Sequence, residues 1–441
     1  MMRSIHILTI MTTFLSTLQK ASALRPPVSS MSSSSTNELI FGVIADVQWA
    51  DADDGYNYGR TVKRCFRGSL RTLDRAVDWW NNLPSTLNAN ANLKTNAFTQ
   101  TKTNTPLHYI AQLGDLIDGI NAAEKLNQRD SALQSALDIL ERAPAKPVNI
   151  VGNHELYNFN RLELSQATWL QHGDAEYYSF IPTPGWRTIV LDPYQLSLMG
   201  FTENDPRRIE SVELLAKMNP NVHPDGRGGD WLAGFKDGDY NRRFVPYNGG
   251  FGSTQLSWLR KELAGASEMG ERVVVMSHVI LHPLACGGTT MAWDYEEALA
   301  ILGNTTSFSM ETDVETETPV VAVLSGHDHR GNHHRCPQTG IHHCTFSSPL
   351  NKGDDGFAFG LVRMTEDGME IWGPRVDDLL PDVEGRPKME VCDGDDITGP
   401  CEKIKLPFRS RNTSTPAERN GDNCEAVPVD VEPITVSQLT I

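Results

Sequence analysis

The sequence predicts an α/β domain in which strands and helices alternate along the chain. Five apolar runs have the length and composition of buried strands, and a polar residue ends each of them. The runs are LIFGVIAD, LHYIAQLGD, PVNIVGNHE, RVVVMSH and PVVAVLSGHDH. Open α/β sheets build their sites beyond the carboxyl ends of the strands, so we expect the polar residues to form one site there.

Apolar residues at helical spacing predict helices between these strands. The expected helices cover residues 60–82, 130–142, 207–218, 254–264 and 293–302. Beyond the last of the five runs the pattern changes to further strands, in the segments GIHHCTF, GFAFGLVRM and MEIWGP. This alternation predicts packed sheets that are covered by helices.

Composition divides the 441 residues into a leader, one large domain and a tail. Residues 1–36 contain no acid and read as a signal or targeting leader with a Ser-rich linker. We expect the domain over residues 37–376, with an Asn/Thr-rich surface insertion at 85–105. Residues 377–441 are acidic and rich in Pro, Gly and Asp, which predicts a poorly ordered tail.

The leader indicates entry into the secretory pathway. A short basic start, the apolar stretch IHILTIMTTFLSTL and the small residues Ala21-Ser22-Ala23 are typical of a cleaved signal peptide. The stretch is too short to favour a permanent membrane span. Two alternatives stay open: a bipartite plastid presequence, to which the Ser-rich run is similar, and translation from Met31, which would leave the protein in the cytosol.

Charge and cysteine content exclude some classes of partner. The net charge of -17 argues against nucleic acid, which requires a basic surface, and favours a small phosphorylated substrate. Seven cysteines without CxxC spacing argue against a structural zinc site. In an exported protein Cys336 and Cys344, or the group Cys392, Cys401 and Cys424, could form disulfides. We expect a monomer.

Taken together and in order, the polar strand ends resemble the pattern of the calcineurin-like metallophosphoesterases over residues 38–376. The segments that carry the resemblance are Asp46-Val47-Gln48, Gly114-Asp115, Gly152-Asn153-His154-Glu155, His278 and Gly326-His327-Asp328-His329. The resemblance implies a β-sandwich flanked by helices, in four αββα layers, with two metal ions at one edge. Two ions can activate a bridging hydroxide and hold the phosphoryl oxygens of a substrate.

The family pattern also implies a ligand set. Asp115 would bridge the two ions; the remaining ligands would be Asp46, Gln48 and His329 on one ion and Asn153, His278 and His327 on the other. Gln48 stands where most of the superfamily has His. A carboxamide oxygen is a harder ligand than imidazole, so we expect manganese to be preferred over zinc. The alternative is that Gln48 does not coordinate.

By the same resemblance, His154 would act on the leaving oxygen and Asp118 would orient it. This pair remains an expectation, because a solvated Asp118 would leave the same sequence. Six further histidines near the motifs fall outside the ligand pattern, and we expect structural or surface roles for them. They are His172, His282, His333, His334, His342 and His343.

Other segments narrow the resemblance to the manganese-dependent ADP-ribose/CDP-alcohol diphosphatases. These segments are Ile44-Ala45-Asp46-Val47-Gln48, Gly249-Gly250-Phe251-Gly252, Gln255-Leu256-Ser257-Trp258-Leu259, Trp293-Asp294-Tyr295-Glu296 and Gly340-Ile341-His342-His343. The resemblance implies hydrolysis of the pyrophosphate bond in these nucleotide diphosphates. The alternatives are a general metallophosphodiesterase or phosphatase and a binding module without activity.

Aromatic residues near the motifs could bind a nucleobase by stacking. The candidates are Trp49, Tyr56 and Tyr58 after the first motif and Phe251 in the Gly-rich segment, and for each of them local packing is an equal alternative. Cys286 is expected to line the substrate pocket, with core packing favoured over a catalytic role. The sequence does not rank the possible nucleotide substrates.

Overall fold

The computed structural model describes residues 38–57, 59–83, 106–170, 176–223, 229–305, 316–381, 390–392 and 401–409. The predicted leader at 1–36 and the predicted insertion at 85–105 lie outside the described residues, so both stay predictions.

One sheet has seven strands and contains the first three predicted strands. Its order is β14 (Glu390–Cys392), β15 (Cys401–Pro407), β13 (Gly368–Gly373), β12 (Phe359–Met364), β1 (Leu39–Ile44), β4 (Tyr109–Gln112) and β5 (Pro147–Asn149). The last three strands are parallel, so their carboxyl ends meet at one edge. The polar residues that follow them therefore lie close together.

The second sheet has six strands. Its order is β10 (Asn332–Arg335), β11 (His342–Thr345), β9 (Val320–Ser325), β8 (Arg272–Met276), β7 (Trp186–Val190) and β6 (Tyr178–Thr183). Strands β7, β8, β9 and β11 are parallel, and β8 and β9 are the remaining two runs predicted from the sequence. A short hairpin, β2 (Gly55–Tyr56) with β3 (Lys63–Arg64), lies outside both sheets.

The two sheets share one core, which makes them a sandwich. Phe41 of β1 stacks on Tyr109 of β4 at 4.8 Å between ring centroids, and Phe180 of the second sheet meets Tyr109 edge-on at 5.5 Å. Buried residues of β8 and β9, among them Val274 and Leu324, belong to the same cluster. Apolar residues on the inner faces thus exclude water between the sheets.

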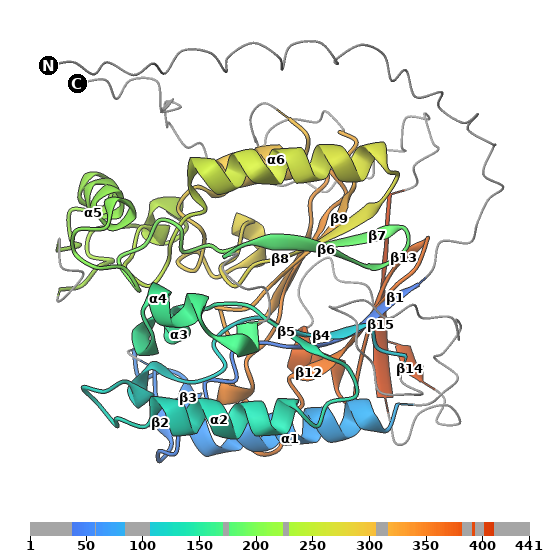
Figure 1. Cartoon of the computed structure of the whole chain (residues 1–441), viewed down its shortest axis with the longest axis horizontal. Coiled ribbons are helices and arrows are strands. Elements are labelled where there is room, and N and C mark those ends of the chain that lie inside the picture. Colours follow the sequence, from blue (N-terminus) through green and yellow to red (C-terminus); the bar gives the residue numbers. More distant parts are fainter. Residues whose placement is uncertain are drawn as a thin grey trace, which may run out of the picture. The chain divides into compact units, whose positions relative to one another are not determined.

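Helices cover the outer faces (Figure 1). On the seven-stranded sheet lie α1 (Phe66–Asn81) and α2 (Arg129–Leu140); on the six-stranded sheet lie α6 (Gly252–Glu268) and α7 (Tyr295–Leu302). Trp80 of α1 packs on Gly42 of β1, and its indole N–H donates to the carbonyl of Gly360 at 2.8 Å. The predicted four-layer αββα architecture is confirmed.

Helix ends follow local signals in the chain. Helix α5 (Pro206–Met218) begins after Asp205, whose carboxylate accepts a hydrogen bond from the Arg207 backbone N–H at 2.9 Å. The first helix starts at Phe66 rather than near residue 60, because β3 occupies the preceding residues. Short helices α3 (Asn153–Asn158), α4 (Arg161–Ser165) and α8 (Val376–Leu379) complete the set that the described residues form.

The expectation of a poorly ordered tail from residue 377 is wrong for Cys401–Pro407. This segment forms β15, which pairs with β13 and buries Ile404 and Leu406 completely. Its alternation of apolar and charged residues suits a strand with one buried face, a pattern that the acidic composition of the tail obscures.

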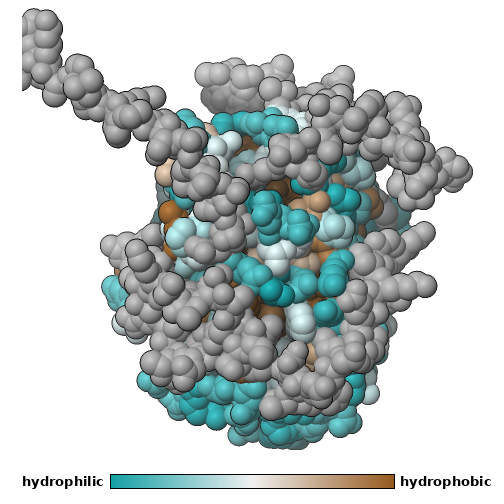
Figure 2. Space-filling model, turned by 90° about the vertical axis from the view of Figure 1, so that its right-hand side faces the viewer, coloured by the Kyte–Doolittle hydropathy of each residue, from teal (hydrophilic) through white to brown (hydrophobic). Residues whose placement is uncertain are grey.

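No helix in the described part of the chain is long and apolar enough to cross a membrane. On the face drawn in Figure 2, hydrophilic residues predominate in the lower part of the described surface.

The side chains of Cys336 and Cys344 are buried without forming a disulfide, so the pairing considered for an exported protein is not present.

Candidate metal centre

The structure brings together the polar residues that follow β1, β4, β5, β8 and β9. Asp46, Asp115 and His329 form one group of possible ligands, and Asp115, His278 and His327 form another; within each group the ligand atoms lie within 4.8 Å of one another. Asp115 belongs to both groups. The arrangement matches the predicted bridging role of Asp115 between two ions.

The backbone at this edge is held in an uncommon conformation. Five of the seven predicted ligands have positive φ angles: Asp46 (51°), Gln48 (46°), Asp115 (56°), His327 (70°) and His329 (66°). Each such residue costs on the order of 1 kcal/mol, and clusters of this kind are typical of functional sites. The sharp turns aim successive side chains back over the ends of the sheets.

Glycines in the motifs permit the close approach of these turns. A Cβ atom at Gly152 would lie 2.1 Å from Asp115 Oδ1, and one at Gly326 would lie 2.4 Å from Asp46 Oδ2. Any larger residue at either position would displace a predicted ligand. This explains why glycine precedes the ligands Asn153 and His327.

Gln48 lies inside the first group of ligands. Its Nε2 is 3.0 Å from Asp115 Oδ2 and 2.8 Å from His329 Nε2, while its Oε1 is buried without a hydrogen-bond partner in the described structure. The two ends of a carboxamide exchange by a half-turn, which would direct the oxygen toward the other ligands. The position of Gln48 therefore fits coordination.

Hydrogen bonds fix the orientation of the two histidines in the second group. Nδ1 of His278 lies 2.7 Å from the carbonyl of Leu113 and donates to it, so Nε2 is left as a ligand atom 3.3 Å from Asp115 Oδ2. Nε2 of His327 is 2.7 Å from Asn248 Oδ1 and donates to it, so Nδ1, which lies 3.2 Å from His278 Nε2, is left as the ligand atom. Such partners set the tautomer of a metal-binding histidine.

Asn153 completes the second group. Its Oδ1 lies 3.3 Å from His278 Nε2 and accepts a hydrogen bond from the Tyr194 hydroxyl at 3.3 Å. The helix α3 begins at Asn153, so its amide is presented directly after β5. An amide oxygen held in this way is a suitable neutral ligand for manganese or another hard cation.

The electrostatics of the protein alone favour cations at this place. Burial raises the pKa of Asp46 to about 7, although the neighbouring His278 and the backbone N–H of His327, which donates to the carboxylate at 2.9 Å, oppose the rise. Burial opposes charge on His278 as well, but the Asp115 carboxylate outweighs it and raises the pKa of His278 to about 10. Two buried carboxylates thus require compensating positive charge, which two divalent ions would supply.

His154 lies beside the centre, with Asp118 behind it. Nδ1 of His154 is 3.3 Å from Asp118 Oδ2 and also accepts a hydrogen bond from the Gly119 backbone N–H at 2.7 Å, while Nε2 is 3.9 Å from Asp115 Oδ2. Burial opposes protonation of His154, but Asp115 and Asp118 together raise its pKa. The Gly119 contact assigns the proton of the neutral ring to Nε2, which faces the centre.

Four residues that the sequence analysis left without a role contact the centre. Glu155 accepts hydrogen bonds from the backbone N–H groups of Asp115, Leu116 and Gly152 at 2.7–2.8 Å and so ties the bridging residue to α3. Asn248 orients His327, as described above. Glu155 belongs to a segment that carries the family resemblance, and Asn248 directly precedes another such segment. Their positions beside these segments were the sequence signal that could have identified them.

Asp328 and Arg64 are the other two residues to which the sequence analysis gave no role. Asp328 accepts hydrogen bonds from Gly287 N–H at 2.6 Å and from the Thr290 hydroxyl at 3.0 Å, so it joins the loop after Cys286 to the turn that carries His327 and His329. Arg64 of β3 lies 3.8 Å from Asp118 Oδ2, and its Nε is buried without a hydrogen-bond partner among the described residues. Arg64 is therefore a partly exposed cation at the edge of the centre.

The structure places the predicted substrate-binding residues in different environments. Trp49 is half-buried beside Asp118, whose backbone N–H donates to the carbonyl of Trp49, and Tyr56 is 63 % exposed on the hairpin that carries Arg64. Phe251 is 1 % exposed in the core under α6, so it offers no face for stacking and the expected role does not fit it. Tyr58 lies outside the described residues.

Cys286 is half-buried, and the backbone N–H of Gly288 donates to its Sγ at 3.2 Å. Burial raises the pKa of the thiol to about 12, which keeps it protonated and unsuited to nucleophilic attack. The five further histidines that the structure describes belong to neither ligand group: His282, His333, His334, His342 and His343. His172 lies outside the described residues.

A solved structure has the same fold. The crystal structure of a dimetal phosphatase from Danio rerio matches with a TM-score of 0.63 at 27 % sequence identity, over 84 % of this chain and 99 % of that one. Together with the paired ligand groups around Asp115, this match places the chain in the class of two-metal phosphoesterases.

Curated relatives define the family. The chain is 31 % identical to the manganese-dependent ADP-ribose/CDP-alcohol diphosphatase of Homo sapiens over 364 residues, which are 79 % of this chain and 94 % of the relative. Relatives with the same name in Arabidopsis thaliana and Oryza sativa are 31 % and 33 % identical and are covered over 93 % and 92 % of their length. No family model matches the chain. The chain belongs to the manganese-dependent ADP-ribose/CDP-alcohol diphosphatase family.

Proposed function

We propose that this protein is a manganese-dependent hydrolase that cleaves the pyrophosphate bond of ADP-ribose and of CDP-alcohols. The observation that carries the proposal is the pair of ligand groups that share Asp115, with His154 beside them. Curated relatives covered over nine-tenths of their length have names that specify this activity.

Each predicted ligand has a position that suits its role. Asp46, Gln48 and His329 would hold one ion, Asn153, His278 and His327 the other, and Asp115 both. Two divalent ions, when bound, activate a water molecule as the nucleophile and neutralise phosphoryl oxygens. The ligand set contains oxygen and imidazole nitrogen but no thiolate, which suits manganese.

The chain's own residues act on the other side of the bond. His154 holds a proton on Nε2 and delivers it to the leaving oxygen, because Gly119 N–H occupies its Nδ1. Arg64, whose side chain is partly exposed beside Asp118, pairs with the phosphate that the ions do not hold. A pyrophosphate substrate has a second phosphate that such a group can bind, whereas a simple diester has none.

One assay separates this function from the alternatives. The protein, stripped of metal by chelation, is supplied with manganese or zinc and with ADP-ribose, CDP-choline or bis(4-nitrophenyl) phosphate. We expect turnover of both nucleotides, higher with manganese. Turnover of the aryl diester alone would indicate a general phosphodiesterase, and binding of nucleotide without any turnover would indicate a binding module.

We further propose that the leader directs the protein into the secretory pathway. The apolar stretch and Ala21-Ser22-Ala23 support cleavage there, so the mature chain should begin near Leu24. Amino-terminal sequencing of protein from its native cells tests this. An intact Met1 would contradict processing, and a start at Met31 would indicate the cytosol.

A further inference from the structure

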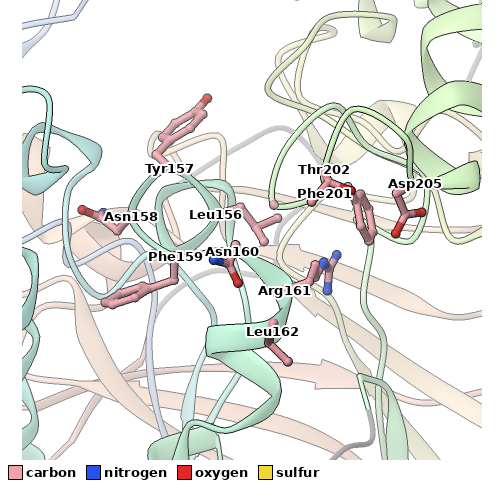
Figure 3. Close-up of a pocket in the computed structure, with 11 residues that line it drawn as sticks. Leu156, Tyr157, Asn158, Phe159, Asn160, Arg161, Leu162, Phe201, Thr202 and Asp205 are labelled. Atoms are coloured by element: carbon pink, nitrogen blue, oxygen red, sulfur yellow. The ribbon is translucent and has the colours of Figure 1, made fainter.

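The pocket drawn in Figure 3 has its charged residues engaged within the protein. It has a volume of about 570 Å³ and is lined by residues of α3, of α4 and of the segment 200–205. Arg161 binds the Asp192 carboxylate and the Tyr194 carbonyl, and Asp205 accepts the capping hydrogen bond of α5. The described residues of its lining therefore leave no charged group to select a ligand.

Two cysteines stand opposite each other at the edge of the seven-stranded sheet. Strands β14 and β15 are antiparallel, and their register pairs Cys392, the last residue of β14, with Cys401, the first residue of β15. Directly opposite residues of an antiparallel pair have Cα atoms about 4.5 to 5.5 Å apart, and disulfides span Cα distances of about 4.4 to 6.8 Å. The two backbones are therefore placed for a disulfide bond.

The charges of a neighbouring pair support this register. Two residues from the cysteines, on the same face, Glu390 stands opposite Lys403, so opposite charges face each other across the two strands. Lys403 is also the register partner of Trp372 on β13, and its Nζ lies 4.8 Å from the centroid of that ring. A slip by one residue would separate the charged pair and the cysteine pair together.

Register also distinguishes these cysteines from the pair on β10 and β11. Cys344 stands opposite His333, whereas Cys336 lies three residues beyond His333. At about 3.4 Å per residue, Cys336 and Cys344 are about 10 Å apart along the strands, which is too far for a disulfide. Seven residues separate this pair in the sequence and eight separate Cys392 from Cys401, so spacing along the chain does not distinguish them.

We propose that Cys392 and Cys401 form a disulfide that fastens β14 to β15. The structure describes Cys401 as a reduced thiol that is 1 % exposed. The oxidant is itself a disulfide, either glutathione disulfide or that of a thiol oxidoreductase. The thiolate of Cys392, on the edge strand, attacks it and expels one thiol; Cys401 then attacks the mixed disulfide and expels the second. The cysteines lose two protons and two electrons, which the oxidant gains as two thiols.

The bond holds a strand that is too short to be stable by itself. Strand β14 has three residues, and β15 is its only partner among the described strands. Cys401 directly precedes the part of β15 that pairs with β13 and buries Ile404 and Leu406. A bond at this position therefore anchors the edge of the sheet to its core, and it does not depend on hydrolysis at the metal centre.

Peptide mapping of the full-length folded protein tests the proposal without any variant. The protein is equilibrated with reduced and oxidised glutathione, unfolded in the presence of N-ethylmaleimide, which labels each remaining thiol, and cut with trypsin. Residues 389–403 form one tryptic peptide that contains both Cys392 and Cys401. We expect this peptide to lose two hydrogen atoms and to carry no label. The tryptic peptide of residues 336–352, with Cys336 and Cys344, is the matched control and should carry two labels.

Three results would overturn the proposal. They are two labels on the peptide 389–403, a bond from that peptide to residues 420–441, which contain Cys424, and equal oxidation of the control peptide. The last result would show that spacing in the sequence, rather than register, brings the thiols together.

Two variants check the partners. Cys392→Ser should leave Cys401 with a label, whereas Cys424→Ser should leave the peptide 389–403 oxidised and unlabelled. An unlabelled Cys401 in Cys392→Ser would mean that its partner is another residue.

Discussion

Single residues at the metal centre have separable roles, because each has its own set of contacts. Asp115 belongs to both ligand groups, whereas the ring of His154 belongs to neither: its Nε2 lies 3.9 Å from Asp115 Oδ2, and the His154 backbone N–H donates to Asp115 Oδ1 at 2.8 Å. Gln48 lies inside the first ligand group, and Arg64 lies at the edge of the centre beside Asp118. Substitution of each residue should therefore change a different measurable quantity.

His154→Ala should keep both ions and lower turnover of ADP-ribose by about 10²- to 10⁴-fold, the usual span for loss of a general acid. The deficit should shrink for bis(4-nitrophenyl) phosphate, because nitrophenolate leaves without a proton. Asp115→Asn is the comparison: it should lose metal and turnover together. The measurements are metal content by mass spectrometry and the turnover rates on ADP-ribose and on bis(4-nitrophenyl) phosphate. Loss of metal in His154→Ala would show that His154 is a metal ligand rather than a general acid.

Gln48→His should shift the metal preference from manganese toward zinc. The carboxamide is a hard, weak ligand, and imidazole at this position would favour the softer ion. The ratio of the manganese-supported to the zinc-supported rate, measured after chelation and reloading, should fall. A wild-type protein that is already most active with zinc would contradict this explanation.

Arg64→Met should raise KM for ADP-ribose about tenfold or more, because loss of a charge-assisted phosphate contact costs about 1.5–3 kcal/mol. Activity on the aryl diester, which has no second phosphate, should change much less. Lys63→Met, on the same strand, is the control, since Lys63 pairs with Asp54 at the surface. Equal losses on both substrates would indicate that Arg64 acts through Asp118 and His154 rather than on phosphate.

At the scale of elements, the site depends on strands from both sheets ending at one edge. The residues after β1, β4 and β5 supply one side, and those after β8 and β9 the other. Packing between the sheets therefore sets the distance between ligands. A strand far along the chain, β15, stabilises this arrangement by extending the first sheet beyond β13.

A chain that ends at Pro400 should be less stable than one that ends at Arg409. The shorter chain lacks β15 and exposes the surface that Ile404 and Leu406 cover, a loss of more than about 3 kcal/mol at typical values for buried aliphatic side chains. The longer chain keeps every residue that the structure describes and serves as the control. Urea unfolding of both should show the difference, and equal midpoints would exclude a stabilising role for β15.

At the scale of the whole molecule, buried histidines outside the metal centre make the fold sensitive to acid. Burial lowers the pKa of His108, His334 and His342 from about 6.5 to about 4. The unfolded chain binds protons at these residues below pH 6.5, but the folded chain binds them only near pH 4. Their stabilising contribution is thus complete above pH 6.5 and is lost as the pH falls toward 4.

Urea unfolding of the metal-free protein at pH 7 and pH 5 should therefore show the contribution of such a histidine as a difference between the wild type and a variant that lacks it. Nδ1 of His108 lies 3.1 Å from Ile40 N and 3.0 Å from Ile40 O, and an amide could make similar contacts without titrating. His108→Asn should reduce the loss of stability between pH 7 and pH 5 by about 2 kcal/mol. An identical pH dependence in the two proteins would exclude titration of His108 as a cause.

Much of the metal centre follows from the sequence, because strand periodicity and motif order are local properties. Each predicted ligand directly follows a strand that the apolar runs predict, and the structure brings these ends together. Burial was harder to predict: Phe251 has the same local signature whether it lies in a loop or in a core. Likewise, β15 is a seven-residue strand inside an acidic segment, where composition outweighs its alternating pattern.

The sequence by itself determined the layered α/β fold, the ligand types and the family, since these depend on periodicity and on the order of short motifs. Only the tertiary structure decided which residues orient the ligands: Asn248 lies 79 positions from His327 along the chain, and Arg64 lies 54 positions from Asp118. The physical reason is that hydrogen bonds, burial and cavities depend on distances between segments, which no local pattern contains.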